Sequence, residues 1–281
     1  MSLNNLYYPF KIIKFMVLES ILNPKNAEDK PLHVFVIAFL YSFVAVVFAH
    51  QLFPQQSSIL AVALVTIMFV PFFQKLFEIE EKIEDLAAEK KITAGLFQRH
   101  KKIIFVFSSF FLGIIFSMSF THVFLGYNEV FSMQTKTIEG FSATATGYGN
   151  FERFFANNSR VMLLTFLLST MFGAGAVLIL AWNASVIAVY IGLLTKPLAA
   201  QIGGVAYLYT LPIGLGSIAL HGIPEIVAYF IAGLAGGILS VGMIRERIGS
   251  REFSTIVKDS LLLLCTAEIL IFVAAGLEAF L

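Results

Sequence analysis

The sequence is dominated by long runs that carry almost no charge. Residues 32–73 and 103–128 contain no Asp, Glu, Lys or Arg, and residues 161–244 contain only Lys196 and Glu225. A helix needs about 20 mostly apolar residues to cross the roughly 30 Å hydrocarbon core of a bilayer. The strands of a membrane β-barrel instead alternate in polarity over about ten residues. The continuous runs therefore predict an all-α, polytopic helical membrane protein.

The composition supports this class and excludes others. Hydrophobic residues make up 58% of the 281 residues and charged residues 13%, against about 45–50% and about 25% in soluble domains. A single cysteine, Cys265, excludes an intramolecular disulfide and any multi-cysteine metal site. A net charge of +1 gives no argument for a nucleic-acid partner. The partner that the composition implies is the lipid bilayer, and no nucleic acid is expected.

We expect about five to seven transmembrane helices, some of them broken or re-entrant. Section 183–220 is the ambiguous one, because Pro197, Gly203 and Pro212 interrupt it. Such breaks persist in a membrane only where the freed backbone groups meet protein or water. Five spans result if this section does not cross twice. The seven expected spans are 32–53, 57–73, 103–125, 161–182, 198–220, 221–244 and 257–281.

The chain divides into an N-terminal part and a core. Residues 1–102 are expected to hold a membrane-surface helix at 6–22, two spanning helices and a charged cytoplasmic helical segment at 74–102. Residues 103–281 form the core membrane domain. Basic loops favour the cytoplasmic side, so a multi-pass protein of the cell membrane is expected, with a cytoplasmic N-terminus. Residues 126–160 and the C-terminus then lie outside.

Three polar residues are expected to meet near the outer face. His221 and Glu225 are four positions apart, so they lie on one face of a helix. Counted at 1.5 Å per residue, Glu225 lies about 30 Å from the basic loop at Arg245. Glu278 lies about 31 Å from a last helix that begins near Val257. The two carboxylates therefore have nearly equal depth, although they are far apart in the sequence.

This set of side chains permits more than one chemistry. One histidine and two carboxylates are a ligand set for a divalent metal, zinc first. The alternatives are a hydrogen-bonded cluster that only fixes helix packing and a proton relay. We expect a spanning helix to begin near His221, which would place Pro224 in its first turn, where proline is tolerated. Supporting polar residues are Asn183 and Glu268, together with Asn157 and Asn158, which we expect to cap a helix that starts near Ser159.

A TATGYG sequence at residues 144–149 is similar to the filter of potassium channels, in which backbone carbonyls replace the hydration shell of the ion. Ala145 stands where the filter has threonine, and the preceding residues 133–139 are too polar for a buried pore helix. We therefore favour an outside loop over a channel.

Several short motifs occur in a specific order along the second part of the chain. Together they resemble the stage II sporulation protein M family of integral membrane proteins, over about residues 105–281. The motifs are Asn157-Asn158, Gly173-Ala-Gly175, Trp182-Asn183, His221-Gly-Ile-Pro-Glu225, Ala232-Gly-Leu-Ala-Gly236, a basic loop with Arg251, and Ala274-Ala-Gly-Leu-Glu-Ala-Phe280.

The resemblance implies a polar signature and a cellular setting. By resemblance, His221, Glu225 and Glu278 are the family's polar signature, and Asn157, Asn158 and Asn183 match its asparagines. Ala184 stands where the family has a glycine. The named member is a membrane part of a complex with peptidoglycan-remodelling partners, and most related proteins have no assigned activity.

Four functional hypotheses follow from these observations. The first is a metal-binding membrane protein that moves or senses a small cation or polar solute. The second is a non-enzymatic scaffold for cell-envelope partners, and the third is an intramembrane metallohydrolase. A cation channel built on the TATGYG loop comes last. No catalytic residue is assigned, and a homodimer is expected through the glycine-rich helices.

Overall fold

The computed structural model describes residue 27 and residues 29–88, 95–142 and 150–280. The surface helix expected at 6–22 and the TATGYG loop lie outside these residues. All regular structure in the described part is helical, which confirms the all-α class. The α-helices that the structure describes between Pro31 and Phe280 are α3 (Pro31–Leu52), α4 (Ser57–Ala88), α5 (Leu96–Phe124), α6 (Ser132–Ser142), α7 (Asn150–Phe172), α8 (Ala176–Ile202), α9 (Ala206–Arg245) and α10 (Arg251–Phe280).

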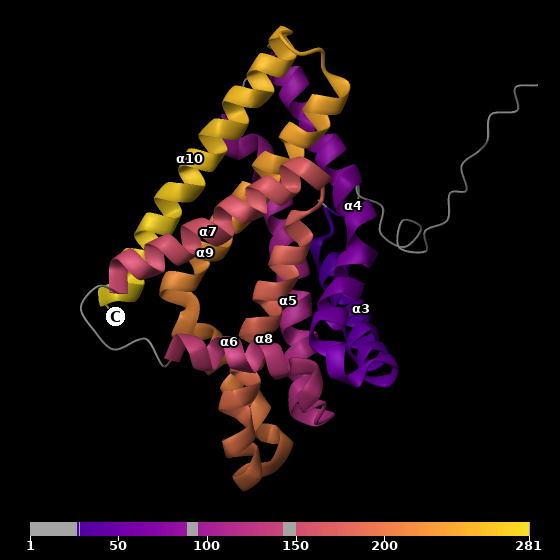
Figure 1. Cartoon of the computed structure of the whole chain (residues 1–281), viewed down its shortest axis with the longest axis vertical. Helices are drawn as coiled ribbons and strands as arrows, with labels where there is room; N and C mark the ends of the chain where they lie inside the picture. Colours follow the sequence, from indigo (N-terminus) through magenta and orange to yellow (C-terminus); the bar gives the residue numbers. More distant parts are fainter. Residues whose placement is uncertain (1–26, 28, 89–94, 143–149, 281) are drawn as a thin grey trace, which may run out of the picture.

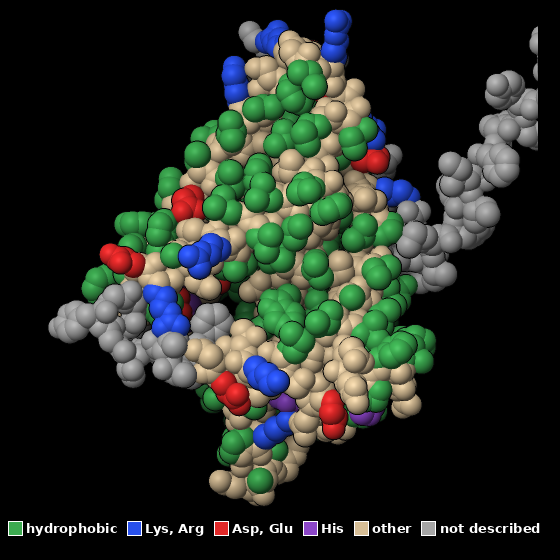
Figure 2. Space-filling view, in the orientation of Figure 1, with side chains coloured by type: hydrophobic (Ala, Val, Ile, Leu, Met, Phe, Trp, Pro, Cys, Tyr) green, Lys and Arg blue, Asp and Glu red, His purple; other side chains and the backbone are tan. Residues whose placement is uncertain are grey.

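The helices form two groups joined along the centre of the molecule (Figure 1). α3, α4 and α5 make one side, α7, α9 and α10 make the other, and α8 runs between them. The short helix α6 crosses the lower part of the view, across the direction of the long helices. Hydrophobic side chains cover much of the surface above it, and Lys and Arg gather at the top vertex (Figure 2). This is the surface expected of a protein surrounded by lipid.

Five stretches of the described residues are long and apolar enough to cross a membrane. One of them, Ala176–Arg245, is 70 residues long and contains both α8 and α9. The protein is therefore a multi-pass membrane protein, and the lower end of the expected range of spans is supported. Which side of the membrane each terminus occupies stays a prediction.

Phenylalanine packing joins the two groups of helices. Phe73 of α4 stacks on Phe107 of α5 with ring centroids 4.9 Å apart. Phe107 in turn stacks on Phe230 of α9 at 5.4 Å. All three rings are buried. Aromatic pairs at these distances add about 0.5–1.5 kcal/mol beyond the burial of their surface, so this row holds α9 against the N-terminal helices.

The expected span at 161–182 is wrong, because the chain turns in its middle. α7 ends at Phe172 and α8 begins at Ala176. Gly173 has a φ of 67°, a conformation that residues with a Cβ rarely adopt. At Gly175 a Cβ would lie 2.2 Å from the backbone oxygen of Leu168. Two glycines thus make a tight turn inside a run that is apolar throughout.

The expected span at 198–220 is also wrong. The chain reverses at the 3₁₀ turn Gly203–Val205, where Gly203 has a φ of 71°. α8 and α9 then run antiparallel. The hydroxyl oxygens of Thr195 and Thr210 lie 2.5 Å apart, and those of Tyr190 and Ser217, further from the turn, lie 3.1 Å apart. Section 183–220 is therefore a hairpin of two antiparallel helices, and how often it crosses the membrane stays a prediction.

The separate span expected at 221–244 is instead the second half of a longer helix. α9 is continuous over 40 residues and contains both Pro212 and Pro224. The prediction that Pro224 lies in a first turn is therefore wrong. A proline removes one backbone donor, and membrane helices tolerate this where neighbouring groups satisfy the freed carbonyl.

The glycine-rich part of α9 is buried inside the chain. A Cβ at Gly236 would lie 2.4 Å from the backbone oxygen of Phe166, and one at Gly237 would lie 2.5 Å from the ring of Phe77. These glycines therefore let α7 and α4 approach α9 and are not available to a second copy. The homodimer stays a prediction, and Gly236 and Gly237 do not supply its contact surface.

The boundary expected between residues 102 and 103 falls inside α5, which begins at Leu96. α4 likewise continues beyond its apolar run as far as Ala88. The helical nature of the charged segment is thus confirmed over its described part. The division into two domains stays a prediction, and the two parts share a helix.

Candidate functional site

Glu225 and Glu278 lie on two helices that pack against each other, α9 and α10. The Tyr229 hydroxyl donates a hydrogen bond of 2.6 Å to Oε1 of Glu225. Glu278, on α10, is close enough to interact electrostatically with both Glu225 and Tyr229. Tyr229 is buried, with 1% of its surface exposed, while Glu225 and Glu278 are partly buried. Two acids that are 53 positions apart in the sequence therefore lie within electrostatic range of each other.

His221 lies one helical turn before Glu225 and is partly buried. No hydrogen bond to its ring is found among the described residues. Within the same residues, no group of three or more His, Cys, Asp or Glu side chains is placed so that it could hold a metal ion. Zinc needs ligand bonds of about 2.0–2.3 Å. The site as it stands is therefore a carboxyl pair with an imidazole nearby, and not an assembled metal centre.

Glu268 makes a separate contact between α7 and α10. The Ser159 hydroxyl donates to its Oε1 at 2.8 Å. Its Oε2 is buried and has no hydrogen-bond partner among the described residues. Glu268 thus pairs with a neighbouring helix, and within the described part of the chain no hydrogen bond joins it to Glu225 or Glu278.

The capping role expected for Asn157 and Asn158 is wrong. α7 begins at Asn150, so both asparagines lie in its interior. Asn157 donates to the side-chain oxygen of Asn158 at 3.1 Å, and Asn158 is buried. The reason is that Phe151 and Phe155 pack on Phe272 of α10 and hold an additional turn of helix against the core.

Asn183 does not join the site through a hydrogen bond. Its amide donates to the backbone oxygen of Ile179, 2.8 Å away and one turn earlier in α8. The side-chain amide of Asn183 thereby forms its hydrogen bond within its own helix, which is common for a polar residue in an apolar span. It does not cap a broken helix, because α8 runs without a break from Ala176 to Ile202.

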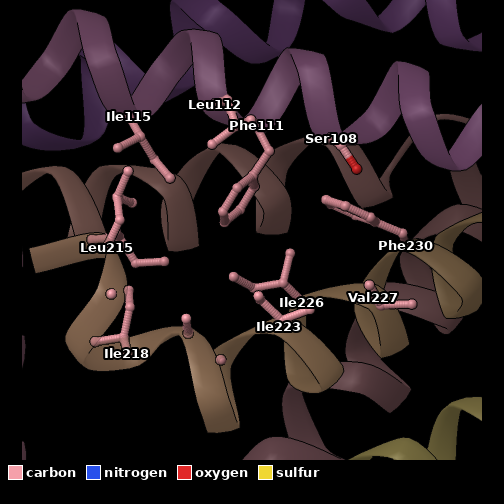
Figure 3. A pocket seen from close by; sticks show the side chains of 14 residues that line it. Ser108, Phe111, Leu112, Ile115, Leu215, Ile218, Ile223, Ile226, Val227 and Phe230 are labelled. Carbon is pink, nitrogen blue, oxygen red and sulfur yellow. The ribbon is translucent and has the colours of Figure 1, made fainter. Parts of the chain in front are cut away.

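A cavity of about 410 Å³ lies beside the same part of α9. Ile223 and Ile226 point into it from α9, and Phe111 and Ile115 face them from α5 (Figure 3). The Ser108 hydroxyl is the polar side-chain group in its lining, and it donates to the backbone of its own helix at 2.8 Å. A lining of this kind cannot replace the hydration shell of a cation. This cavity therefore does not supply a polar path to Glu225.

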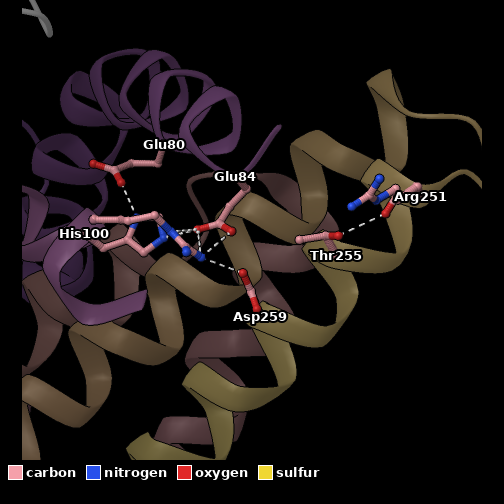
Figure 4. Close-up of polar contacts among 7 residues, drawn as sticks. Glu80, Glu84, His100, Arg251, Thr255 and Asp259 are labelled. Carbon is pink, nitrogen blue, oxygen red and sulfur yellow. Dashed lines mark hydrogen bonds and ion pairs between the residues drawn. The ribbon is translucent and has the colours of Figure 1, made fainter. Parts of the chain in front are cut away.

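A second buried polar cluster, which we call the α4–α5 acid cluster, consists of Glu80, Glu84, Arg99, His100 and Asp259. Both ring nitrogens of His100 contact carboxylates, Nδ1 that of Glu80 and Nε2 that of Glu84 (Figure 4). Arg99 Nη2 donates to Glu84 Oε2 at 2.8 Å and to Asp259 Oδ2 at 2.6 Å. The cluster thereby links α4 and α5 to α10.

The sequence does not reveal this cluster directly, because residues 74–102 have the composition of a charged segment at the membrane edge. Glu80 and Glu84 are nevertheless each 1% exposed and His100 is 2% exposed. The spacing carries a signal, since Glu80 and Glu84 continue the helical face of the buried residues Phe73 and Leu76. The polar side of this helix thus faces the protein interior.

A comparison with known protein families covers the second part of the chain. The family model described as stage II sporulation protein M matches residues 102–281, which is more than half of the chain. The chain belongs to the stage II sporulation protein M family. No curated protein and no solved structure matches it. In this member of the stage II sporulation protein M family, Glu225 and Glu278 lie within the matched segment, whereas Glu80, Glu84 and His100 precede it.

Proposed function

We propose that this membrane protein binds a small cation at the Glu225–Glu278 carboxyl pair and moves or senses that cation. The observation that carries the proposal is that α9 packs against α10 with one acid of each helix within electrostatic range of the other. Two carboxylates repel each other strongly where water is scarce, and a cation between them removes this repulsion. Ionisable groups inside a membrane are costly and commonly mark ion pathways.

A divalent metal, with zinc first, is the cation that we propose. His221 supplies an imidazole on the same face of α9, one turn from Glu225. Binding would have to draw His221 and Glu278 toward Glu225, because the described residues contain no assembled group of three ligands. Tyr229 supports this role, since its hydroxyl holds Oε1 of Glu225 and no described residue forms a hydrogen bond to Oε2. Partners of this kind orient metal-binding carboxylates in many proteins.

Zinc binding by the purified full-length protein tests the proposal. We expect one saturable equivalent of zinc in the wild type and its loss in Glu225→Gln, Glu278→Gln and His221→Ala. Glu252→Gln, in the first turn of α10, is the matched control and should bind as the wild type does. Absence of saturable binding in protein purified without chelators would overturn the metal proposal.

Movement of the cation needs its own measurement. In vesicles that contain the protein and a zinc-sensitive dye, we expect an influx that Glu225→Gln and Glu278→Gln both abolish. Zinc binding without influx would favour sensing over movement.

The second candidate is a non-enzymatic scaffold for cell-envelope partners. The Ser159–Glu268 bond favours it, because that bond joins α7 to α10. A folded protein that binds no cation, and that loses stability in Glu225→Gln and Glu268→Gln alike, would support the scaffold.

A further inference from the structure

The hydrogen bonds of the α4–α5 acid cluster depend on how many protons its histidine and carboxyl groups hold. A carboxylate only accepts hydrogen bonds, and a neutral imidazole has one N–H and one lone pair. His100 nevertheless has a carboxylate at each of its two ring nitrogens, Glu80 at Nδ1 and Glu84 at Nε2. With a neutral ring and two ionised acids, one of these contacts would set a lone pair against a lone pair. The three side chains therefore need one additional proton.

We propose that Glu80, His100 and Glu84 form a buried proton-binding site in which the bound proton makes His100 an imidazolium ion. The proton enters from solvent and forms the second N–H bond of the ring. Each N–H then donates to one carboxylate. When the proton leaves, that N–H bond breaks, the proton returns to solvent, and His100 keeps a hydrogen bond to only one acid.

The charges around the ring favour retention of the proton. Among the five described groups of the cluster, three carboxylates and one guanidinium give a net charge of −2, and the imidazolium reduces this to −1. Burial alone would favour a neutral ring. The carboxylates of Glu80 and Glu84 oppose this, because each is in contact with a ring nitrogen and unlike charges attract more strongly where water is excluded. Buried charges of this kind need partners, and the imidazolium is the partner of both Glu80 and Glu84.

Other charged groups near the cluster are already engaged. Glu78 pairs with Arg245 of α9 at 2.7 Å, and Glu81 lies 3.5 Å from the same guanidinium. Lys102 pairs with Asp29 at 2.8 Å on the surface. The residues between α4 and α5, 89–94, lie outside the described part. On the faces that the structure describes, Glu80 and Glu84 are thus the acids in contact with the ring.

The bound proton affects more than the contact between α4 and α5. Glu84 also accepts from Arg99, and Arg99 donates to Asp259 of α10. Loss of the proton therefore changes the charge balance of a link between the N-terminal helices and α10. The inference is independent of the proposed cation site, since it uses none of the residues of that site.

Nitrogen NMR of histidine-labelled full-length protein in detergent tests the proposal. The chain has five histidines, and a free imidazole is neutral at pH 8. We expect one imidazolium signal at pH 8, with both nitrogens protonated, and its absence in His100→Gln. If all five rings are neutral at pH 8, the proposal is overturned.

Two matched variants separate a specific effect of Glu80 from the general effect of removing one negative charge from α4. In Glu80→Gln the amide can donate to the ring nitrogen, so the ring no longer needs its second proton. We expect proton binding at His100 to weaken by at least about tenfold, as loss of an adjacent charge does. Glu78→Gln removes the same charge from the same helix but from a residue that pairs with Arg245. If both variants weaken proton binding equally, Glu80 has no specific role and the site is wrong.

The pH dependence of stability gives a second readout. The proton stabilises the folded state at neutral pH, and this contribution is lost as the pH rises and the proton is released. We expect the melting temperature of the wild type to fall between pH 8 and pH 10, with a smaller fall in Glu80→Gln. Equal falls in the two proteins would contradict a stabilising proton.

Discussion

At the scale of single residues, each polar group that faces the apolar interior must find a partner. The Tyr229 hydroxyl and the Glu225 carboxyl satisfy each other on one face of α9. Glu225 could be placed from the sequence, because its spacing from His221 and its depth against Glu278 are readable from residue numbers. Tyr229 could not, since one more aromatic residue in an apolar run gives no sign that its hydroxyl faces an acid.

We predict that Tyr229→Phe lowers the free energy of unfolding by about 1–2 kcal/mol. The substitution keeps the buried ring and removes one hydrogen bond to an acid, which is worth about that much. Unfolding in a denaturing detergent, followed by circular dichroism, measures the change. Tyr209→Phe is the control, because Tyr209 is 58% exposed, and it should change stability by less than about 0.5 kcal/mol. Equal losses in the two variants would show that the Tyr229–Glu225 bond contributes nothing specific.

At the scale of helices, the apolar runs fixed which segments are helical but not where they turn. Gly173 and Gly203 turn the chain inside such runs, because each adopts a positive φ. Pro212 and Pro224, which suggested breaks, lie inside the continuous helix α9. Hydropathy cannot separate these cases, because it averages the polarity of side chains and does not report where φ becomes positive. The contacts of α9 with α7 and with α8 hold these segments in place, and such contacts are not visible in composition.

The close contact between α7 and α9 leads to a prediction about Gly236. In Gly236→Ala the new methyl group would lie 2.4 Å from the backbone oxygen of Phe166 and 2.8 Å from Cβ of Ser169. We expect a loss of about 1–3 kcal/mol in the free energy of unfolding, as overpacking usually causes. Gly216→Ala, in the same helix, meets no atom within 4 Å and should be neutral or stabilise by up to about 1 kcal/mol. A stable Gly236→Ala variant would mean that α7 and α9 do not pack closely.

At the scale of the whole molecule, the basic residues around the loop between α9 and α10 predict how the protein is oriented in the membrane. The loop between α9 and α10 lies at the top vertex of Figure 1, and α6 lies toward the opposite end. Arg245, Arg247 and Arg251 flank or form the loop. Since basic loops favour the cytoplasmic side, the loop should face the cytoplasm and α6 the outside. The helix packing is the same in either orientation in the membrane. The orientation is therefore predicted from the positions of the basic residues and not from the fold.

Labelling of single cysteines in intact cells tests this orientation. Cys265, which is exposed, is first replaced by alanine, and then Ile248→Cys and Glu139→Cys are made separately. Ile248 is 81% exposed, and Glu139 is exposed on α6. We expect a membrane-impermeant maleimide to label position 139 in intact cells and position 248 only after the cells are opened, because the arginines hold their loop against the anionic inner leaflet. The reverse pattern would invert the orientation, and labelling of both positions from outside would show that α6 and the basic loop share one side.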